Sequence, residues 1–146
     1  MSLSALTLGV CMQLAAGTSA SPVFLPTEQF MLAWDHSIEK VRWEENYNVV
    51  LSETGELQLQ AAQARIKGSG SGMEPPEDAV YRDGWFYYTP AMHSPTELRL
   101  TRSEFVPDYQ WCDVQGCRPL SALIPRDGGV TVLWPCFAPH VGKGSY

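Results

Sequence analysis

The sequence predicts an all-β fold, in the form of a single antiparallel sandwich or barrel-like domain of about ten short strands. Short apolar runs alternate with residues that interrupt regular structure, and the chain contains 12 Gly and 11 Pro among its 146 residues. No segment combines a helical period with clear start and stop signals. The length suits one domain, with residues 5–136 expected as the folded core and residues 137–146 as a frayed tail.

Each expected strand is a short run of apolar or alternating residues bounded by Gly, Pro, Asp or Ser. Residues 58–64 are rich in Ala and Gln, which makes them the most helix-compatible part of the chain, but we expect the strand pattern to continue through them. In chain order, the expected strands are Leu6–Leu14, Val23–Leu25, Gln29–Ser37, Val41–Leu51, Leu57–Ile66, Val80–Arg82, Trp85–Thr89, Leu98–Thr101, Gln110–Cys112 and Val130–Trp134.

The N-terminal segment 5–20, ALTLGVCMQLAAGTSA, has the apolar character and small-residue ending of a signal peptide. It has no Lys or Arg before Lys40, however, and Gly9 and Gln13 interrupt its apolar run, so we expect a strand and a turn instead. No segment approaches the ~20 apolar residues of a transmembrane helix. If the native protein is exported, we expect its targeting segment to lie upstream.

The charge composition argues against a polyanionic partner. The formal net charge is −6, from 16 acidic and 10 basic residues, and the basic residues are scattered along the sequence. A nucleic-acid binder usually gathers Lys and Arg on one face. We therefore expect no nucleic-acid partner, and contact with a membrane only through a native N-terminal anchor that this chain lacks.

The segment 34–46, WDHSIEKVRWEEN, predicts a β-hairpin with Ser37–Lys40 as its loop. The other face of the second strand alternates with its apolar face and carries mostly polar side chains, including Glu44, which suits solvent. The predicted register pairs residues that all belong to the two apolar faces: His36 with Val41, Trp34 with Trp43, Leu32 with Glu45, and Phe30 with Tyr47.

Two residues of this hairpin, His36 and Glu45, are polar although they lie on the apolar faces. A buried carboxylate is costly unless it is paired, so Glu45 should have a partner or line a cavity. Both residues are either polar groups satisfied at the end of a sheet or parts of a polar ligand pocket beside two tryptophans. Ser37 lies on the opposite face from His36, which argues against a Ser-His nucleophile pair.

The second unusual stretch is the glycine-rich run at 67–73, KGSGSGM. Its alternate glycines permit backbone shapes that can present N–H groups to an anion, although a flexible turn has the same composition. Neither the spacing of a P-loop nor that of a dinucleotide fingerprint is present. We expect His36, Ser37 and Glu45 to line one concave binding surface together with the Gly68–Met73 loop, because both regions depart from the strand pattern.

Four cysteines leave several interpretations open. Cys112 and Cys117 flank a hairpin loop, DVQG, so a disulfide could join its strands, and Cys11 and Cys136 would then form a second pair. Four reduced core cysteines are the alternative. A zinc site is poorly supported, because Cys11 and Cys136 have no neighbouring Cys or His at metal-ligand spacing.

Four blocks of sequence resemble the bacterial domain-of-unknown-function family "eighteen-fifty": FMLAWDHSIEK at 30–40, WEE at 43–45, GSGSGM at 68–73 and DGW at 83–85. The resemblance runs from about Leu6 to Trp134. Members of that family are typically small exported or membrane-anchored proteins, often encoded beside TRAP transporters of the TAXI type. By position, the residues that match the family-like blocks are His36, Ser37, Glu39, Glu45, Gly70, Gly72 and Met73.

The resemblance implies a periplasmic location, or one on the extracytoplasmic face of the inner membrane, and a role related to transport. We therefore expect an accessory or binding module that contacts a transporter component, a periplasmic binding protein or a small solute, with no cofactor and no metal. The alternatives are a small hydrolase-like enzyme that uses His36 and Glu45 as a pair, or a purely structural domain. The sequence contains no nucleophile motif that would favour the enzyme.

Overall fold

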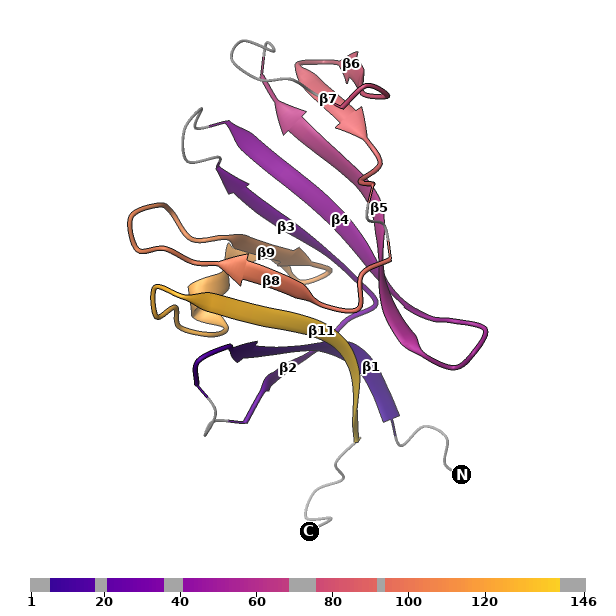
Figure 1. Ribbon diagram of the computed structural model, residues 1–146, viewed down its shortest axis with the longest axis vertical. Coiled ribbons are helices and arrows are strands. Elements are labelled where there is room, and N and C mark those ends of the chain that lie inside the picture. The colour runs from indigo at the N-terminus through magenta and orange to yellow at the C-terminus, as the bar shows by residue number, and fades with distance from the viewer. Residues whose placement is uncertain (1–5, 18–20, 36–40, 69–75, 92–93, 140–146) are drawn as a thin grey trace.

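The computed structural model describes residues 6–17, 21–35, 41–68, 76–91 and 94–139 and shows two antiparallel β-sheets packed as a sandwich (Figure 1). The small sheet has the strand order β2 (Val23–Pro26), β1 (Leu6–Leu14), β11 (Val130–Pro139) and β8 (Leu98–Thr101). The large sheet has the order β10 (Gly116–Pro119), β9 (Gln110–Asp113), β3 (Gln29–Asp35), β4 (Arg42–Leu51), β5 (Leu57–Lys67), β7 (Trp85–Tyr88) and β6 (Val80–Arg82). The predicted all-β class is confirmed, and the architecture is a sandwich rather than a closed barrel.

The core forms where the small sheet covers β9, β3, β4 and the first half of β5. Its centre is a stack of rings, because Phe30 lies 4.6 Å from Trp111 and 5.3 Å from Tyr47 between ring centroids. The small sheet contributes aliphatic side chains, among them Met12 and Leu133, which are fully buried. Strands β7 and β6 lie at the edge of the large sheet farthest from the small sheet (Figure 1), so the inner face of the large sheet extends beyond the core.

Most strand limits match the prediction within two residues, and β11 is the main exception. It continues to Pro139, where a frayed tail was expected from residue 137, because its backbone stays paired with β1 as far as Leu6. A proline normally ends a central strand, but β8 pairs only with Val130–Leu133. Pro135 therefore lies where β11 has a partner on one side alone, and its missing N–H costs no ladder bond.

The hairpin predicted around residues 113–116 implied a strand after its loop, and that strand is β10; the 3-10 turn that follows it, η2 (Leu120–Ala122), was not among the predicted elements. Gly116 and Pro119 are atypical of strands, so the sequence gives β10 no clear strand signal. Proline is tolerated here because β10 is the edge strand of the large sheet. Within the described ranges, no helix has the length and apolar character that a membrane crossing requires.

Both predicted disulfides are present. Cys11 and Cys136 join the adjacent strands β1 and β11, with their Cα atoms 6.0 Å apart. Cys112 and Cys117 lie directly opposite each other in the β9–β10 hairpin, and their Cα separation of 4.0 Å is slightly below the expected ~4.4–6.8 Å. Because all four sulfurs are joined in pairs, the interpretations with reduced cysteines or with a zinc site are wrong.

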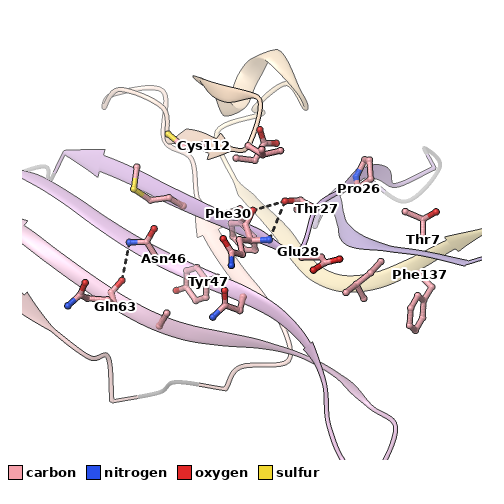
Figure 2. A pocket seen from close by; sticks show the side chains of 17 residues that line it. Thr7, Pro26, Thr27, Glu28, Phe30, Asn46, Tyr47, Gln63, Cys112 and Phe137 are labelled. Carbon is pink, nitrogen blue, oxygen red and sulfur yellow. Dashed lines mark hydrogen bonds between the residues drawn. The ribbon is translucent and has the colours of Figure 1, made fainter.

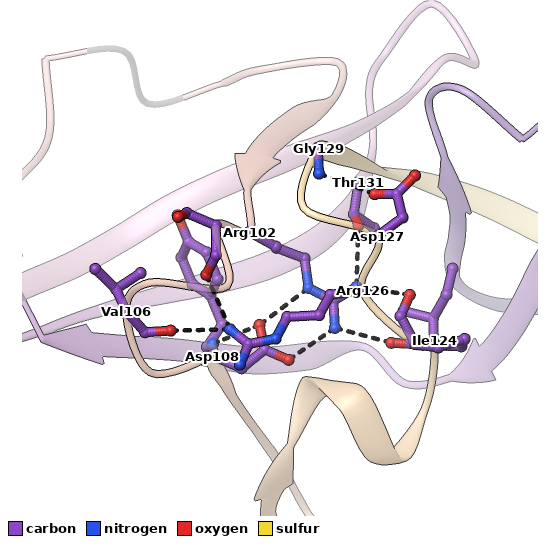
Figure 3. A network of polar contacts seen from close by, with 11 residues as sticks. Arg102, Val106, Asp108, Ile124, Arg126, Asp127, Gly129 and Thr131 are labelled. Carbon is purple, nitrogen blue, oxygen red and sulfur yellow. Dashed lines mark hydrogen bonds and ion pairs between the residues drawn. The ribbon is translucent and has the colours of Figure 1, made fainter.

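A buried arginine holds the loops at one end of the sandwich (Figure 3). Arg102 is only 1% exposed, and its guanidinium donates to both carboxylate oxygens of Asp108, at 3.0 and 2.7 Å. It also donates to the hydroxyl of Thr131 and to the carbonyl of Ile124. Burial acts to raise the pKa of Asp108, but the hydrogen bonds from Arg102 and from the backbone N–H of Tyr109 outweigh it and lower that pKa. The network therefore fixes the connections on either side of β9, β10 and η2.

Candidate functional site

Glu45 lies on the inner face of β4, in the part of the large sheet that the hairpin prediction singled out. The observed register pairs Phe30 with Tyr47, Leu32 with Glu45, and Trp34 with Trp43, as predicted. On the other side of β4, Glu45 lies opposite Ala64 of β5, and Ala64 in turn lies opposite Tyr88 of β7. The small side chain of Ala64 thus separates Glu45 from Tyr88 in one row across three strands.

The Glu45 carboxylate is partly buried and has a phenol as its hydrogen-bond partner. The hydroxyl of Tyr47 donates to Glu45 Oε1 at 2.6 Å. Burial raises the pKa of Glu45 above its ordinary value, and the bond from Tyr47 offsets this only in part. Among the described residues, no Lys or Arg forms an ion pair with Glu45. The prediction that Glu45 would have a partner or line a cavity is confirmed on both counts.

The cavity beside Glu45 has a volume of ≈ 440 Å³, which is within the usual range for small-molecule sites. Glu45 and Tyr47 form its wall on the large sheet, and the segment that leads into β8 forms the opposite wall. Its rim carries one ion pair, in which Arg99 Nη1 lies 3.2 Å from Glu97 Oε2. The full lining is Glu45, Tyr47, Pro90, Pro95, Thr96, Glu97, Leu98 and Arg99.

Aromatic side chains surround the carboxylate. Burial, and then the charge of Glu45, raise the pKa of Tyr88 to about 12, and both effects also raise the pKa of Tyr109. The ring of Tyr109 lies 5.5 Å from that of Trp34, which is 6.0 Å from Trp43. The same face of the large sheet therefore holds one carboxylate among phenols and indoles.

The neighbouring residue, Glu44, corrects the prediction that the other face of β4 suits solvent. Glu44 is only 6% exposed, because two guanidinium groups cover it. Its Oε2 lies 2.6 Å from Arg42 Nε and its Oε1 lies 2.7 Å from Arg65 Nε. Burial acts to raise the pKa of Glu44, but the hydrogen bonds and charges of Arg42 and Arg65 outweigh it and lower that pKa.

A β-bulge in β5 brings Arg65 to Glu44. Asn46 pairs with Gln63 and Tyr47 pairs with Ala61, so the residue between them, Ala62, is left without an opposite residue. The bulge exchanges the two faces of the strand, as an extra residue must. As a result Arg65 lies on the outer face, opposite Glu44, although strict alternation along the strand would have placed it inside.

Four of the ten basic residues gather on this outer face, although the sequence shows them as scattered. The guanidinium of Arg65 lies 3.7 Å from the ring of Trp85, and Lys67 contacts the same ring at 5.2 Å. Arg82 lies 4.4 Å from the ring of Tyr87. With Arg42, these side chains form a basic and aromatic stripe across β4, β5, β7 and β6 that only the strand register reveals.

A second cavity, a wide groove of ≈ 1380 Å³, lies between the outer face of β3, β4 and β5 and the ends of β1 and β11 (Figure 2). It is larger than the Glu45 cavity, but its polar groups are already satisfied or exposed. Asn46 donates to the carbonyl of Gln63, and Asp113 accepts from Trp111 and Gln115. Glu28 is exposed. Since an acid with a perturbed pKa in a cleft is a candidate functional group, we place the candidate site at Glu45.

Six of the seven predicted binding residues lie outside the described residues: His36, Ser37, Glu39, Gly70, Gly72 and Met73. The described residues that flank them are informative, because Trp43 pairs with Ile66. The ends of β4 and β5 that lead to the hairpin loop and to the glycine-rich run are therefore at the same end of the large sheet. Their common binding surface remains a prediction.

The described residues contain no group of three or more His, Cys, Asp or Glu side chains that could hold a metal ion. The sequence could not reveal Tyr88, Tyr109, Pro90 or residues 95–99 as neighbours of Glu45, because they come from separate strands and loops. Only the misplaced carboxylate in an apolar face pointed to the site.

Together, these features define the chain as a two-sheet antiparallel sandwich with a carboxylate, Glu45, in a small cavity of its inner face, where no described basic residue pairs with it. The family model "Domain of unknown function (DUF1850)" matches residues 30–120, more than half of the chain, so the chain belongs to this family. The match is narrower than the resemblance and covers the large sheet and β8, including Glu44 and Glu45, but not β1, β2 or β11. No curated protein and no solved structure shows significant similarity to the chain.

Proposed function

We propose that this protein is a non-catalytic, extracytoplasmic binding module of a solute uptake system, and that it holds a small solute in the Glu45 cavity. One observation carries the proposal. Glu45 places a carboxylate in the wall of a ligand-sized cavity, and no basic side chain of the described residues neutralises it.

The energetics favour a functional role for Glu45. Placing a carboxylate in a low-dielectric environment without a cation costs free energy, and an apolar residue would serve the inner face of a sheet better. Glu44, on the same strand, shows how the fold neutralises a buried carboxylate, because it is paired with two arginines. A carboxylate that breaks the local rule and lines a cavity is the kind of departure expected at a binding site.

The proposed location rests on the two disulfides and on the family. Disulfides persist in oxidising compartments such as the bacterial periplasm. The resemblance implies exported proteins encoded beside TRAP transporters, which supports a role in solute uptake. Alkylation of free thiols in intact cells, followed by mass spectrometry of the protein, tests the location. We expect all four cysteines to be protected, and four alkylated cysteines would contradict an oxidising compartment.

Ligand-observed NMR with mixtures of small amines, amino acids, carboxylates and sugars tests the binding role. We expect at least one of these classes to bind the unmodified protein and to lose binding in Glu45→Gln. Glu53→Gln is the matched control, because Glu53 is an exposed acid in the turn between β4 and β5. If no solute binds, or if Glu45→Gln binds every solute as well as the control does, the Glu45 cavity is not a solute site.

A further inference from the structure

The Glu45 cavity has an unbalanced negative charge. Its described lining contains two acids, Glu45 and Glu97, and one base, Arg99. Arg99 is already paired with Glu97 at the rim, where both side chains are about half exposed. Among the described residues, Glu45 is therefore left without a counter-ion, and it is more buried than the rim pair, so water screens its charge less.

The carboxylate also has an unused acceptor. Tyr47 donates to Oε1, and among the described residues nothing bonds to Oε2. Hydroxyl groups of Tyr88 and Tyr109 lie close enough to Glu45 for its charge to raise their pKa values, and hydroxyls can accept as well as donate hydrogen bonds. The indoles of Trp34 and Trp43 lie on the same face of the sheet but do not line the cavity, whose aromatic lining residue among the described residues is Tyr47. Aromatic rings attract cations through their negative faces.

We infer that the Glu45 cavity recognises a protonated amine, with Glu45 as the counter-ion and Tyr47 as the aromatic side chain of its wall. The inference rests on the proposed binding function and names the chemical class of its ligand. An ammonium group supplies the two things that Glu45 lacks, which are a positive charge and an N–H donor for Oε2. A neutral or anionic solute of the same shape supplies neither the charge nor the gain from pairing it.

The test compares three probes that share a phenylethyl or phenylmethyl body and differ in charge: 2-phenylethylammonium, 2-phenylethanol and phenylacetate. Proton-decoupled ¹³C NMR of protein labelled at the glutamate carboxyl carbons follows Glu45 directly, and Glu45→Gln assigns its resonance. We expect the ammonium probe to shift the Glu45 resonance and to bind about tenfold or more tightly than the alcohol, a preference worth about 1.4 kcal/mol. The preference should disappear in Glu45→Gln and persist in Glu53→Gln.

The amine should also lower the pKa of Glu45 when it binds, because a cation favours the charged form of a carboxylate. A pH titration of the same resonance, with and without the ammonium probe, measures this effect. Circular dichroism of Glu45→Gln checks that the variant is folded, which we expect because its amide oxygen can still accept from Tyr47.

The possible failures differ from one another. If the alcohol or phenylacetate shifts the Glu45 resonance as strongly as the amine does, the cavity binds solutes and the inference about their charge is overturned. If none of the three probes shifts this resonance, the inference is overturned as well. The proposed binding function falls with it only if the wider solute mixtures also fail to bind.

Discussion

Glu44 and Glu45 are consecutive residues of one strand. Both are carboxylates that the fold shields from water, but their surroundings shift their pKa values in opposite directions. Glu44 lies on the outer face between two guanidinium groups, and its pKa is lowered. Glu45 lies on the inner face with a phenol as its one hydrogen-bond partner in the part of the chain that the structure describes, and its pKa is raised. The residues opposite them on β5 account for the difference, because Glu44 faces Arg65 and Glu45 faces Ala64. The chain neutralises Glu44 with two arginines, whereas no basic side chain within the described ranges pairs with Glu45.

The largest expected effect comes from removing both cations that cover Glu44. The double variant Arg42→Ala/Arg65→Ala removes both guanidinium groups that cover Glu44, so the carboxylate loses its counter-ions and water can reach it. We expect a loss of about 2–4 kcal/mol in the free energy of unfolding, less than for a fully buried pair because both arginines are about a third exposed. Urea denaturation followed by fluorescence measures it.

The matched control for this double variant is Arg82→Ala, which removes an exposed arginine that stacks on Tyr87 and does not touch Glu44. We expect this change to cost about 1 kcal/mol or less. If the double variant loses no more than the control does, the arginines do not stabilise Glu44 and the contrast with Glu45 fails.

A smaller effect is expected when the hydrogen bond from Tyr47 to Glu45 is removed. Tyr47→Phe removes the hydroxyl that donates to Glu45 and keeps the ring that stacks on Phe30. We expect a loss of about 1–3 kcal/mol, because a partly buried carboxylate is left with one bond fewer. The pKa of Glu45 should rise further, which ¹³C NMR of the carboxyl group measures. An unchanged pKa would show that the hydroxyl does not bond to Glu45 in solution.

The pH dependence of stability separates the two acids by its sign. Because the folded state raises the pKa of Glu45, it holds this proton more tightly than the unfolded chain does, so stability falls as pH rises from the ordinary carboxyl pKa through the raised one. Glu45→Gln removes this loss, and the variant should gain on the order of 1 kcal/mol or less relative to the unmodified protein at neutral pH. Thermal unfolding at a series of pH values from 4 to 8 checks it.

Glu44→Gln should show the opposite sign. The lowered pKa of Glu44 means that its contribution is present above the ordinary carboxyl pKa and is lost as pH falls through the lowered pKa. Glu44→Gln should therefore flatten the acid side of the stability profile, whereas Glu45→Gln flattens the side toward neutral pH. Parallel profiles for the two variants would contradict the contrast.

The last variant copies the outer arrangement to the inner face, and its readout is the pKa of Glu45 rather than stability. Ala64→Lys places a cation opposite Glu45, as Arg65 lies opposite Glu44. Because Ala64 is buried, the longer side chain should cost stability in Ala64→Lys and in Ala64→Met alike. In Ala64→Lys the pKa of Glu45 should fall, and the preference for the ammonium probe should disappear. Ala64→Met adds a side chain of similar length without charge, so the pKa of Glu45 should stay above its ordinary value in this variant.

The sequence predicted Glu45 and missed the role of Glu44, for a physical reason. Alternation of apolar and polar residues assigns each side chain to a face, and it correctly placed Glu45 inside and Glu44 outside. It does not reveal which residues stand opposite on the next strand. The pairing of Glu44 with Arg65 depends on the bulge at Ala62, and a single extra residue leaves no clear sign in a stretch that reads AAQA.

The fold class and most of the strands were predictable because their signals are local. Short apolar runs and their bounding Gly, Pro and Asp residues are visible within a few positions. The order of strands in the two sheets is not local, and neither is the network around Arg102, whose acceptors come from β11 and from two separate loops. An isolated arginine in the sequence therefore gave no indication that it is among the most buried residues of the described chain.

The pairing of β1 with β11 has a consequence for the order of events during biosynthesis. The first strand of the small sheet finds its neighbour 125 residues later, measured between the disulfide-bonded Cys11 and Cys136. While the ribosome is still making the chain, β1 has only the short strand β2 beside it, and two strands alone are not stable in water. Closing so long a loop is slow, because its entropy must be lost before the contact is gained. The small sheet can therefore assemble only after β11 has been synthesised. Until then, the nascent chain lacks both the pairing of β1 with β11 and the Cys11–Cys136 disulfide.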